Sequence, residues 1–208
     1  MRSIGEFFEL LYLRFAVGLY NFKEEWLVKK RFYSSAFFKK LDKALLSSPN
    51  PYSIAKAFPY GETPLTTLQQ IADRWSISPS DYLIELGCGR GRGVLFLSHY
   101  TGCKAKGIDW IPSFIAHAKA VSKQTPNVTF SCGDIMKADL SSATIIYLYG
   151  TCLDDAAIYA LSERFKQLPP STKIITVSYP LPGFTIQDEL VGSFPWGEAD
   201  IYLQTKSS

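Results

Sequence analysis

The chain has 208 residues, of which 47% are apolar and 20% are charged, and its formal net charge is +3. This length suits one domain with an extension, and the apolar fraction is high enough for a sizeable core. Seven basic and three acidic residues lie between residues 23 and 43, so the remainder of the chain is close to neutral. This distribution argues against a broad nucleic-acid-binding face on the core, although the basic segment could serve as an arm.

The N-terminal segment is strongly apolar from residue 4 to residue 22, but Glu6, Glu9 and Arg14 interrupt it. A membrane-spanning helix would place these three charges in lipid, so we expect a helical extension over residues 1–50 instead. Two interpretations of this extension remain open. Its helix packs on the core or on a partner subunit, or it makes peripheral membrane contact while the basic residues after it attract anionic lipid.

The domain itself is expected over residues 51–208, because the sequence Ser-Ser-Pro-Asn-Pro at 47–51 is the clearest break in the chain. Apolar runs then alternate with amphipathic stretches. We expect strands at 82–86, 105–109, 128–131, 144–149, 173–179, 184–194 and 200–205. We expect helices at 65–75, 93–100, 113–123 and 154–166. This alternation predicts an α/β fold, a Rossmann-like doubly wound sheet of seven mostly parallel strands.

The four cysteines, Cys88, Cys103, Cys132 and Cys152, contain no C-x-x-C pair, and no histidine stands at zinc-ligand spacing. Each lies near the end of an expected strand, where a small apolar side chain packs well. We therefore expect a reduced chain without a metal site, located in the cytoplasm, with membrane association if the extension binds lipid.

The most informative stretch is Glu-Leu-Gly-Cys-Gly-Arg-Gly at residues 85–91, directly after an expected strand. Its glycines let the backbone turn sharply and lie close to a ligand, and the next helix offers N–H groups to it. The dinucleotide pattern G-x-G-x-x-G is absent, since Arg92 and Val94 occupy the places of its third glycine. Glu85 would repel a pyrophosphate, whereas it would attract the ammonium and sulfonium groups of S-adenosylmethionine. The loop therefore predicts an S-adenosylmethionine site.

Two further acids follow the next two expected strands. Asp109 lies about twenty residues beyond the glycine loop, where a carboxylate can accept hydrogen bonds from two ribose hydroxyls. Asp134 can accept from an adenine amino group while Ile135 packs on the ring. Each aspartate alone would be an ordinary turn residue. Acids at the ends of three consecutive strands together indicate a cofactor site.

These motifs resemble the seven-strand S-adenosylmethionine-dependent methyltransferases, from about residue 60 to the C-terminus. A narrower resemblance rests on Tyr-Gly-Glu-Thr at 60–63, ahead of the helix that leads into the glycine loop. It is similar to the Dot-type, non-SET histone-lysine methyltransferases, in which a Tyr-Gly-Glu loop folds over the methionine end of the cofactor. The compact size and the apolar N-terminal segment also resemble small bacterial relatives of the ATP-synthase c-subunit lysine methyltransferases.

The resemblance implies an S-adenosylmethionine-dependent methyltransferase that acts on a protein amine, a lysine side chain. It further implies which residues bind the cofactor, and these come from the 60–63 loop, the glycine loop and the strand ends. They are Tyr60, Glu62, Thr63, Glu85, Gly87, Cys88, Gly89, Gly91, Asp109, Trp110, Gly133, Asp134, Ile135 and Tyr149.

The acceptor side departs from the Dot-type pattern. Those enzymes carry an Asn pair after the fourth strand, where this chain has Tyr149 and Gly150. A lysine nucleophile must arrive neutral, and a dry aromatic channel would lower its pKa. We expect Tyr149, Trp196 and Tyr202 to line this channel. Two alternatives remain open: the acceptor is a small molecule or RNA, or the chain is a non-catalytic S-adenosylmethionine-binding module.

Overall fold

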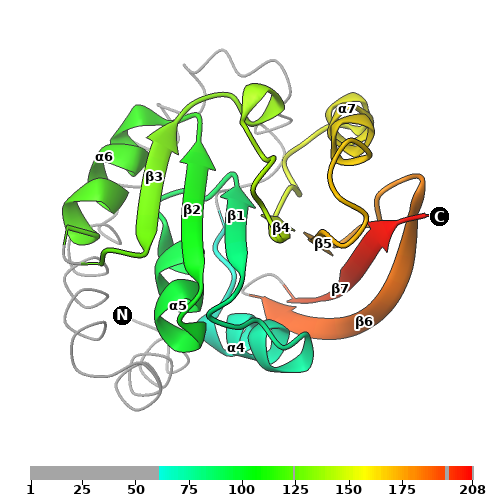
Figure 1. The fold of residues 1–208 in the computed structure, drawn as a ribbon, viewed down its shortest axis with the longest axis horizontal. Helices are drawn as coiled ribbons and strands as arrows, with labels where there is room; N and C mark the ends of the chain where they lie inside the picture. The colour runs from blue at the N-terminus through cyan, green and yellow to red at the C-terminus, as the bar shows by residue number, and fades with distance from the viewer. Residues whose placement is uncertain (1–60, 124, 195–196, 208) are drawn as a thin grey trace.

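The computed structural model describes residues 61–123, 125–194 and 197–207 (Figure 1). Some of the expectations concern residues outside these ranges and stay predictions. They are the helical extension, the domain boundary near residue 50, and the roles assigned to Tyr60 and Trp196. The membrane contact assigned to the extension and the cytoplasmic location stay predictions as well. None of the described helices has the length and apolar character of a membrane-spanning segment.

The described strands form a seven-stranded sheet in the order β3-β2-β1-β4-β5-β7-β6 (Figure 1). Strands β1 to β5 are parallel, while β7 pairs antiparallel with β5 and β6. The strands are β1 (Tyr82–Leu86), β2 (Lys104–Asp109), β3 (Val128–Cys132), β4 (Ile145–Leu148), β5 (Lys173–Val177), β6 (Phe184–Phe194) and β7 (Gly197–Lys206). This arrangement confirms the predicted doubly wound, mostly parallel sheet.

Helices cover both faces of the sheet (Figure 1). The described helices are α4 (Leu65–Arg74), α5 (Arg92–Thr101), α6 (Pro112–Val121), the short 3₁₀ helix η1 (Ile135–Lys137) and α7 (Asp155–Phe165). One core cluster includes Leu68 of α4, Leu97 of α5 and Ile115 of α6. The other includes Leu161 and Phe165 of α7. Two buried cores therefore lie on opposite faces of one sheet, as expected for a doubly wound fold.

The central strand β1 shows why these residues form a doubly covered strand. Leu83 belongs to the core under α4 and α5, whereas Ile84 and Leu86 belong to the core under α7. Side chains alternate between the faces of a strand, so a strand buried on both faces is apolar at nearly every position. Glu85 is the exception: this residue is only 7% exposed, and its carboxylate faces Gly93 of α5.

The end of β5 is two residues earlier than expected, because Ser178 leaves the extended conformation. Its φ of 74° lies in the left-handed region, and its N–H donates to the carbonyl of Asp200 at 2.8 Å. A buried network holds the turn: the Thr176 hydroxyl donates to the Tyr179 carbonyl at 2.6 Å and accepts from Gln204 at 2.9 Å. These bonds compensate for the strained backbone and fix where the chain leaves the sheet.

Helix α4 is tied to the edge strand β6 by Asp188, which lies at a register shift of that strand. Arg74 donates to both carboxylate oxygens of Asp188, at 2.8 and 2.7 Å, and Trp75 Nε1 donates at 2.9 Å. These donors hold the pKa of Asp188 well below its usual range. The bidentate geometry makes this pair more effective than an ordinary surface ion pair.

We expect Asp188→Asn to lower the thermal midpoint of unfolding at neutral pH. A carboxyl group whose pKa is lowered by folding stabilises the protein above its unfolded pKa, about 3.9, and this contribution is lost as the pH falls. The difference in midpoint between wild type and variant should therefore shrink below about pH 4. Calorimetry from pH 7 to pH 3 measures it, with Glu198→Gln on β7 as the exposed control. A difference that does not change with pH would contradict this assignment.

Candidate active site

The predicted site residues gather at the carboxyl edge of the parallel strands. Strand β1 lies between β2 and β4, and β2 lies next to β3, so the segments that follow these strands are neighbours. The loop after β1 is joined to β2, because the N–H groups of Gly87 and Cys88 both donate to the Ile108 carbonyl, at 2.9 and 3.0 Å. In such sheets, ligands bind beyond the carboxyl ends of the strands.

The glycine loop turns directly into helix α5. Gly87, with φ of 77°, adopts a left-handed conformation, and a Cβ added there would meet nothing within 4 Å. This position therefore borders open space at the edge of the sheet. Gly91, also left-handed, is the N-cap of α5. Cys88 is buried in the loop, and burial raises the pKa of its thiol, so it remains protonated and packs.

Glu85 places a buried carboxyl group at this edge. One oxygen, Oε2, has no hydrogen-bond partner among the described residues, while the N–H of Val94 donates to the carboxyl group. The pKa of Glu85 is raised to about 8. Burial is the largest cause, and the neighbouring carboxylates of Glu62 and Asp109 contribute to the rise. An unsatisfied buried acceptor is costly, so the site favours a cationic donor that would complete it.

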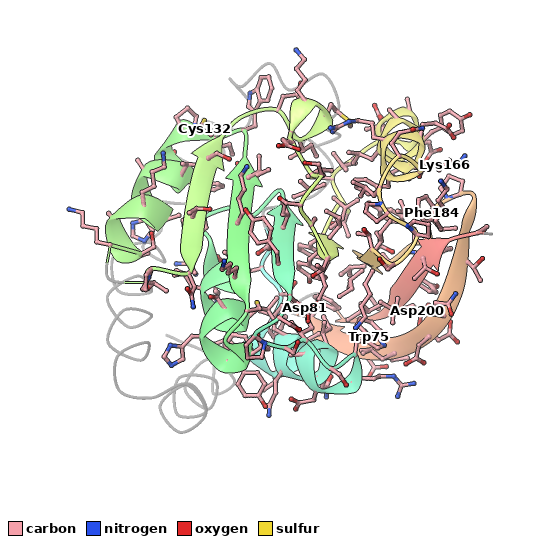
Figure 2. The ribbon with its side chains drawn as sticks, in the orientation of Figure 1. Trp75, Asp81, Cys132, Lys166, Phe184 and Asp200 are labelled. Carbon is pink, nitrogen blue, oxygen red and sulfur yellow. The ribbon has the colours of Figure 1, made fainter. Side chains whose placement is uncertain are left out.

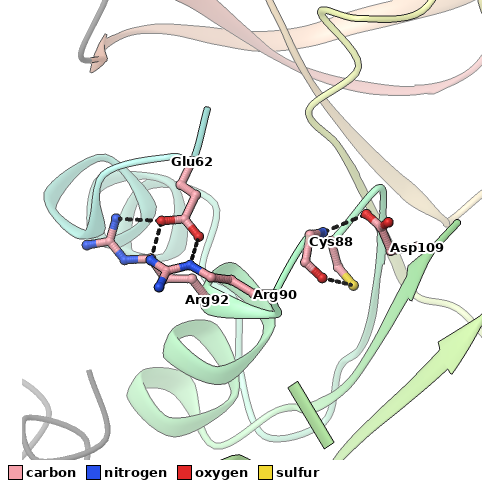
Figure 3. Close-up of polar contacts among 6 residues, drawn as sticks. Glu62, Cys88, Arg90, Arg92 and Asp109 are labelled. Carbon is pink, nitrogen blue, oxygen red and sulfur yellow. Dashed lines mark hydrogen bonds and ion pairs between the residues drawn. The ribbon is translucent and has the colours of Figure 1, made fainter. Parts of the chain in front are cut away.

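Asp109 ends β2 and is 8% exposed. One carboxylate oxygen accepts from the Gly89 N–H at 2.8 Å (Figure 3), and the other accepts from the Ile111 N–H, also at 2.8 Å. Burial raises the pKa of Asp109, and these two backbone donors oppose the rise. Each carboxylate oxygen still has a lone pair available, so Asp109 can accept two further hydrogen bonds.

The segment after β3 forms the third part of the site. Asp134 Oδ1 accepts from the Met136 N–H at 2.8 Å and caps η1, while a Cβ added at Gly133 would meet nothing within 4 Å. Arg164 of α7 holds η1 in place, because its guanidinium donates to the Ile135 carbonyl at 2.7 Å. Trp110, directly after Asp109, is half-buried.

The segment ahead of α4 reaches the site through Glu62 and Thr63. Thr63 Oγ1 is 2.6 Å from the hydroxyl of Tyr147, a fully buried residue that pairs with Glu85 across β1 and β4. Glu62 forms a bidentate ion pair with Arg90 of the glycine loop (Figure 3). Sequence reasoning assigned Glu62 to the cofactor and missed Arg90, although Arg90 lies between two of the loop glycines.

Of the three aromatic residues expected to line the acceptor channel, Tyr149 and Tyr202 lie within the described ranges. Tyr149 stacks on Phe194 of β6, with ring centroids 5.7 Å apart, and a Cβ added at Gly61 would be 3.1 Å from the Tyr149 hydroxyl. Tyr202 is not brought to this stack. It pairs with Thr176 on β5, and its neighbour Ile201 belongs to the core that Tyr149 packs against, so alternation places Tyr202 on the other face of the sheet.

We therefore correct the prediction that Tyr202 lines the same channel as Tyr149. Its hydroxyl lies instead 3.4 Å from Asp200 on its own strand. Another tyrosine, Tyr179, packs closely against Gly150. A Cβ added at Gly150 would be 2.3 Å from the Tyr179 hydroxyl. Figure 2 labels Asp200, the β7 residue whose carboxylate lies near the Tyr202 hydroxyl.

The described residues contain no cluster of three or more metal-ligating side chains. The carboxyl edge of the sheet fits an adenosyl ligand with a cationic end. It has a buried oxygen on Glu85 without a hydrogen-bond partner among the described residues, a buried carboxylate at Asp109, and open space at Gly87 and Gly133.

This sheet order, with a glycine loop after β1, defines the seven-strand S-adenosylmethionine-dependent methyltransferases. Residues 85–188 match the family described as "ANTKMT methyltransferase domain", and since this match covers half of the 208 residues, the chain belongs to that family.

The relatives differ in the substrates that their names give. The chain is 26% identical over 155 residues, 66% of its length, to a "Histone-lysine N-methyltransferase, H3 lysine-79 specific" of Dictyostelium discoideum. It is 29% identical over 106 residues, 48% of its length, to sterol 24-C-methyltransferase ERG6 of Saccharomyces cerevisiae. These alignments span only 8% and 28% of the two relatives. An RNA methyltransferase of Salinibacter ruber, solved with S-adenosyl-L-homocysteine, has a TM-score of 0.61 and 24% identity, covering 71% of this chain and 95% of that one.

Proposed function

We propose that this methyltransferase transfers a methyl group from S-adenosylmethionine to the side-chain amine of a lysine in a protein. Membership of the ANTKMT methyltransferase family and the similarity to a histone-lysine methyltransferase support a protein substrate. The structural observation that carries the proposal is the stack of Tyr149 on Phe194, directly after β4 and beside Gly61.

The residues at the carboxyl edge would divide the cofactor between them. Glu85 would accept a hydrogen bond from the ammonium group through its unsatisfied oxygen. Asp109 would accept from the ribose hydroxyls, and Asp134 from the adenine amino group, with Ile135 and Trp110 beside the ring. When bound, the cofactor supplies a methyl carbon on a sulfonium, which is open to in-line attack by a nucleophile.

The aromatic pair would prepare the amine for that attack. An ammonium group has no lone pair, and an apolar aromatic environment favours the neutral amine because it disfavours the charged form. The Tyr149 hydroxyl could accept one N–H of the amine and so orient its lone pair. Orientation of this kind can supply much of the rate of a displacement, and no strong base is then required.

The test is to follow the methyl group. We expect that purified protein, incubated with S-adenosylmethionine labelled in the methyl group and an extract of host cells, will label protein, and that acid hydrolysis will release the label as methyllysines. Glu85→Gln, which lacks the carboxylate at the cation site, is the matched inactive control. Label in protein that is released as another amino acid would contradict the lysine assignment.

A second candidate function is methylation of RNA or a small molecule, which the similarity to an RNA methyltransferase and a sterol methyltransferase favours. The same incubation separates the two functions. Label confined to nucleic acid or to the low-molecular-weight fraction would replace the protein substrate. Tight cofactor binding without turnover on any fraction would instead support the non-catalytic module.

A further inference from the structure

A buried ion pair joins Arg90 of the glycine loop to Glu62, which lies ahead of α4. Both nitrogens on one edge of the Arg90 guanidinium, Nε and Nη2, donate to the two oxygens of Glu62 (Figure 3). The side chain of Arg90 is 2% exposed and that of Glu62 is 10% exposed. Burying two charges costs free energy, which such a pair offsets only when its geometry is good, as the bidentate fork is here.

This pair joins two segments that are 28 residues apart and that both border Glu85. Arg90 lies in the loop that follows β1. Glu62 is next to Thr63, whose hydroxyl contacts Tyr147, and Tyr147 pairs with Glu85 in register. The segment from residue 61 to 63 is thus held at two points, on β4 through Thr63 and on the glycine loop through Glu62.

The pair also sets the charge beside the cation site. The negative charge of Glu62 acts on Glu85 and opposes its ionisation. Arg90 neutralises Glu62 at short range, and Arg92 adds a second positive charge 3.8 Å from the same carboxylate. Without Arg90, Glu62 would lose the bidentate partner that holds it, and two buried carboxyl groups would compete at one edge.

We propose that Arg90 is a positioning residue for cofactor binding: its ion pair with Glu62 fixes the 61–63 segment against the glycine loop and so shapes the site for the amino-acid end of S-adenosylmethionine. Glu62 then acts through Arg90 and not as a direct ligand. The proposal rests on the methyltransferase activity and is independent of the identity of the methyl acceptor.

Two ligands distinguish this role from a general loss of structure. S-Adenosylhomocysteine has the amino-acid end, whereas 5′-methylthioadenosine has the same adenosine without it. We expect Arg90→Met to weaken binding of S-adenosylhomocysteine by about tenfold or more, measured by calorimetry on the full chain, and to change binding of methylthioadenosine by less than about twofold. Arg74→Met removes a bidentate ion pair far from the loop and is the matched control, expected to leave both affinities unchanged.

A double variant tests the pairing itself. Removing one partner of a buried pair leaves an uncompensated charge, whereas removing both does not. Glu62→Gln combined with Arg90→Met should therefore bind S-adenosylhomocysteine more tightly than Arg90→Met alone. If Arg90→Met does not fold, Arg90→Lys, which keeps the charge but loses the fork, should show the same selective loss in a smaller degree. Equal weakening of both ligands, or wild-type affinity for both, would overturn the proposal.

Discussion

Replacement of Glu85 by glutamine is expected to remove most of the pH dependence of S-adenosylmethionine binding below pH 7.5. In the free protein, burial raises the pKa of Glu85 to about 8, so the group is largely protonated at neutral pH. A cationic ligand favours the carboxylate, and binding should therefore release a proton. Wild-type affinity should then rise by about tenfold for each pH unit between pH 6 and 7.5, whereas the affinity of Glu85→Gln should stay nearly constant.

The size of the effect follows from the lost charged hydrogen bond. At pH 7.5 the variant should bind more weakly by about 1.5 to 3 kcal/mol, and the difference should narrow as the pH falls. Calorimetry in two buffers of different ionisation enthalpy measures the released proton directly. Glu189→Gln, on the exposed strand β6, is the matched control. Parallel pH profiles for wild type and Glu85→Gln would contradict the role of Glu85 at the cation site.

The same raised pKa determines how the stability of the free protein depends on pH. A group whose pKa is raised by folding stabilises the protein below its unfolded pKa, and this contribution is lost as the pH rises through the folded pKa. For Glu85 this window runs from about 4.5 to about 8. Bound cofactor should offset the loss, so the thermal shift produced by S-adenosylmethionine should be larger at pH 7.5 than at pH 6.

Replacement of Asp109 by alanine is expected to weaken cofactor binding by about 1.5 to 3 kcal/mol, through the loss of charged hydrogen bonds to the ribose. The carboxylate also accepts from the N–H groups of Gly89 and Ile111, so the variant leaves two buried donors without that partner. Asp109→Asn keeps the shape of the side chain and isolates the effect of the charge. Calorimetric titration with S-adenosylhomocysteine gives the affinity of each variant.

A ligand without one hydroxyl separates the ribose contact from the loop contact. Wild type should bind the 2′-deoxy analogue of S-adenosylhomocysteine more weakly than the parent compound. Asp109→Ala should bind the two ligands with equal affinity. Asp139→Ala is the matched control, since Asp139 also accepts from a backbone N–H, that of Ser141 at 3.0 Å, but in an exposed loop. If Asp109→Ala still discriminates between the two ligands, the ribose assignment is incorrect.

The sequence predicted the centre of the sheet well because the parallel strands β1, β4 and β5 are buried at nearly every position. The run at 82–86 is apolar at nearly every position, and β1 has the expected bounds. The alternating strand β6 also has its expected bounds, Phe184–Phe194. Errors lie at the strand ends. The expected strand at 173–179 includes Ser178 and Tyr179, whereas a left-handed Ser178 and a bond to Asp200 end β5 at Val177.

The sequence could predict which residues meet at the carboxyl edge, because they lie at the ends of the neighbouring strands β1, β2 and β3. The acceptor half depends on contacts between distant segments, which no local pattern encodes. The stack of Tyr149 on Phe194 joins the residue directly after β4 to one in β6, and the face on which Tyr202 lies depends on the register of β7. The Arg90–Glu62 pair likewise requires two loops to meet.

The central claim is that the methyl donor lies across the carboxyl ends of β1, β2 and β3, with its cationic end against Glu85. A crystal structure of the complex with S-adenosylhomocysteine tests this most directly. The predicted result is an ammonium nitrogen within about 3 Å of a Glu85 oxygen and ribose hydroxyls within hydrogen-bond distance of Asp109. A ligand bound at another edge of the sheet, or one whose ribose and amino-acid end are interchanged between Glu85 and Asp109, would contradict the account.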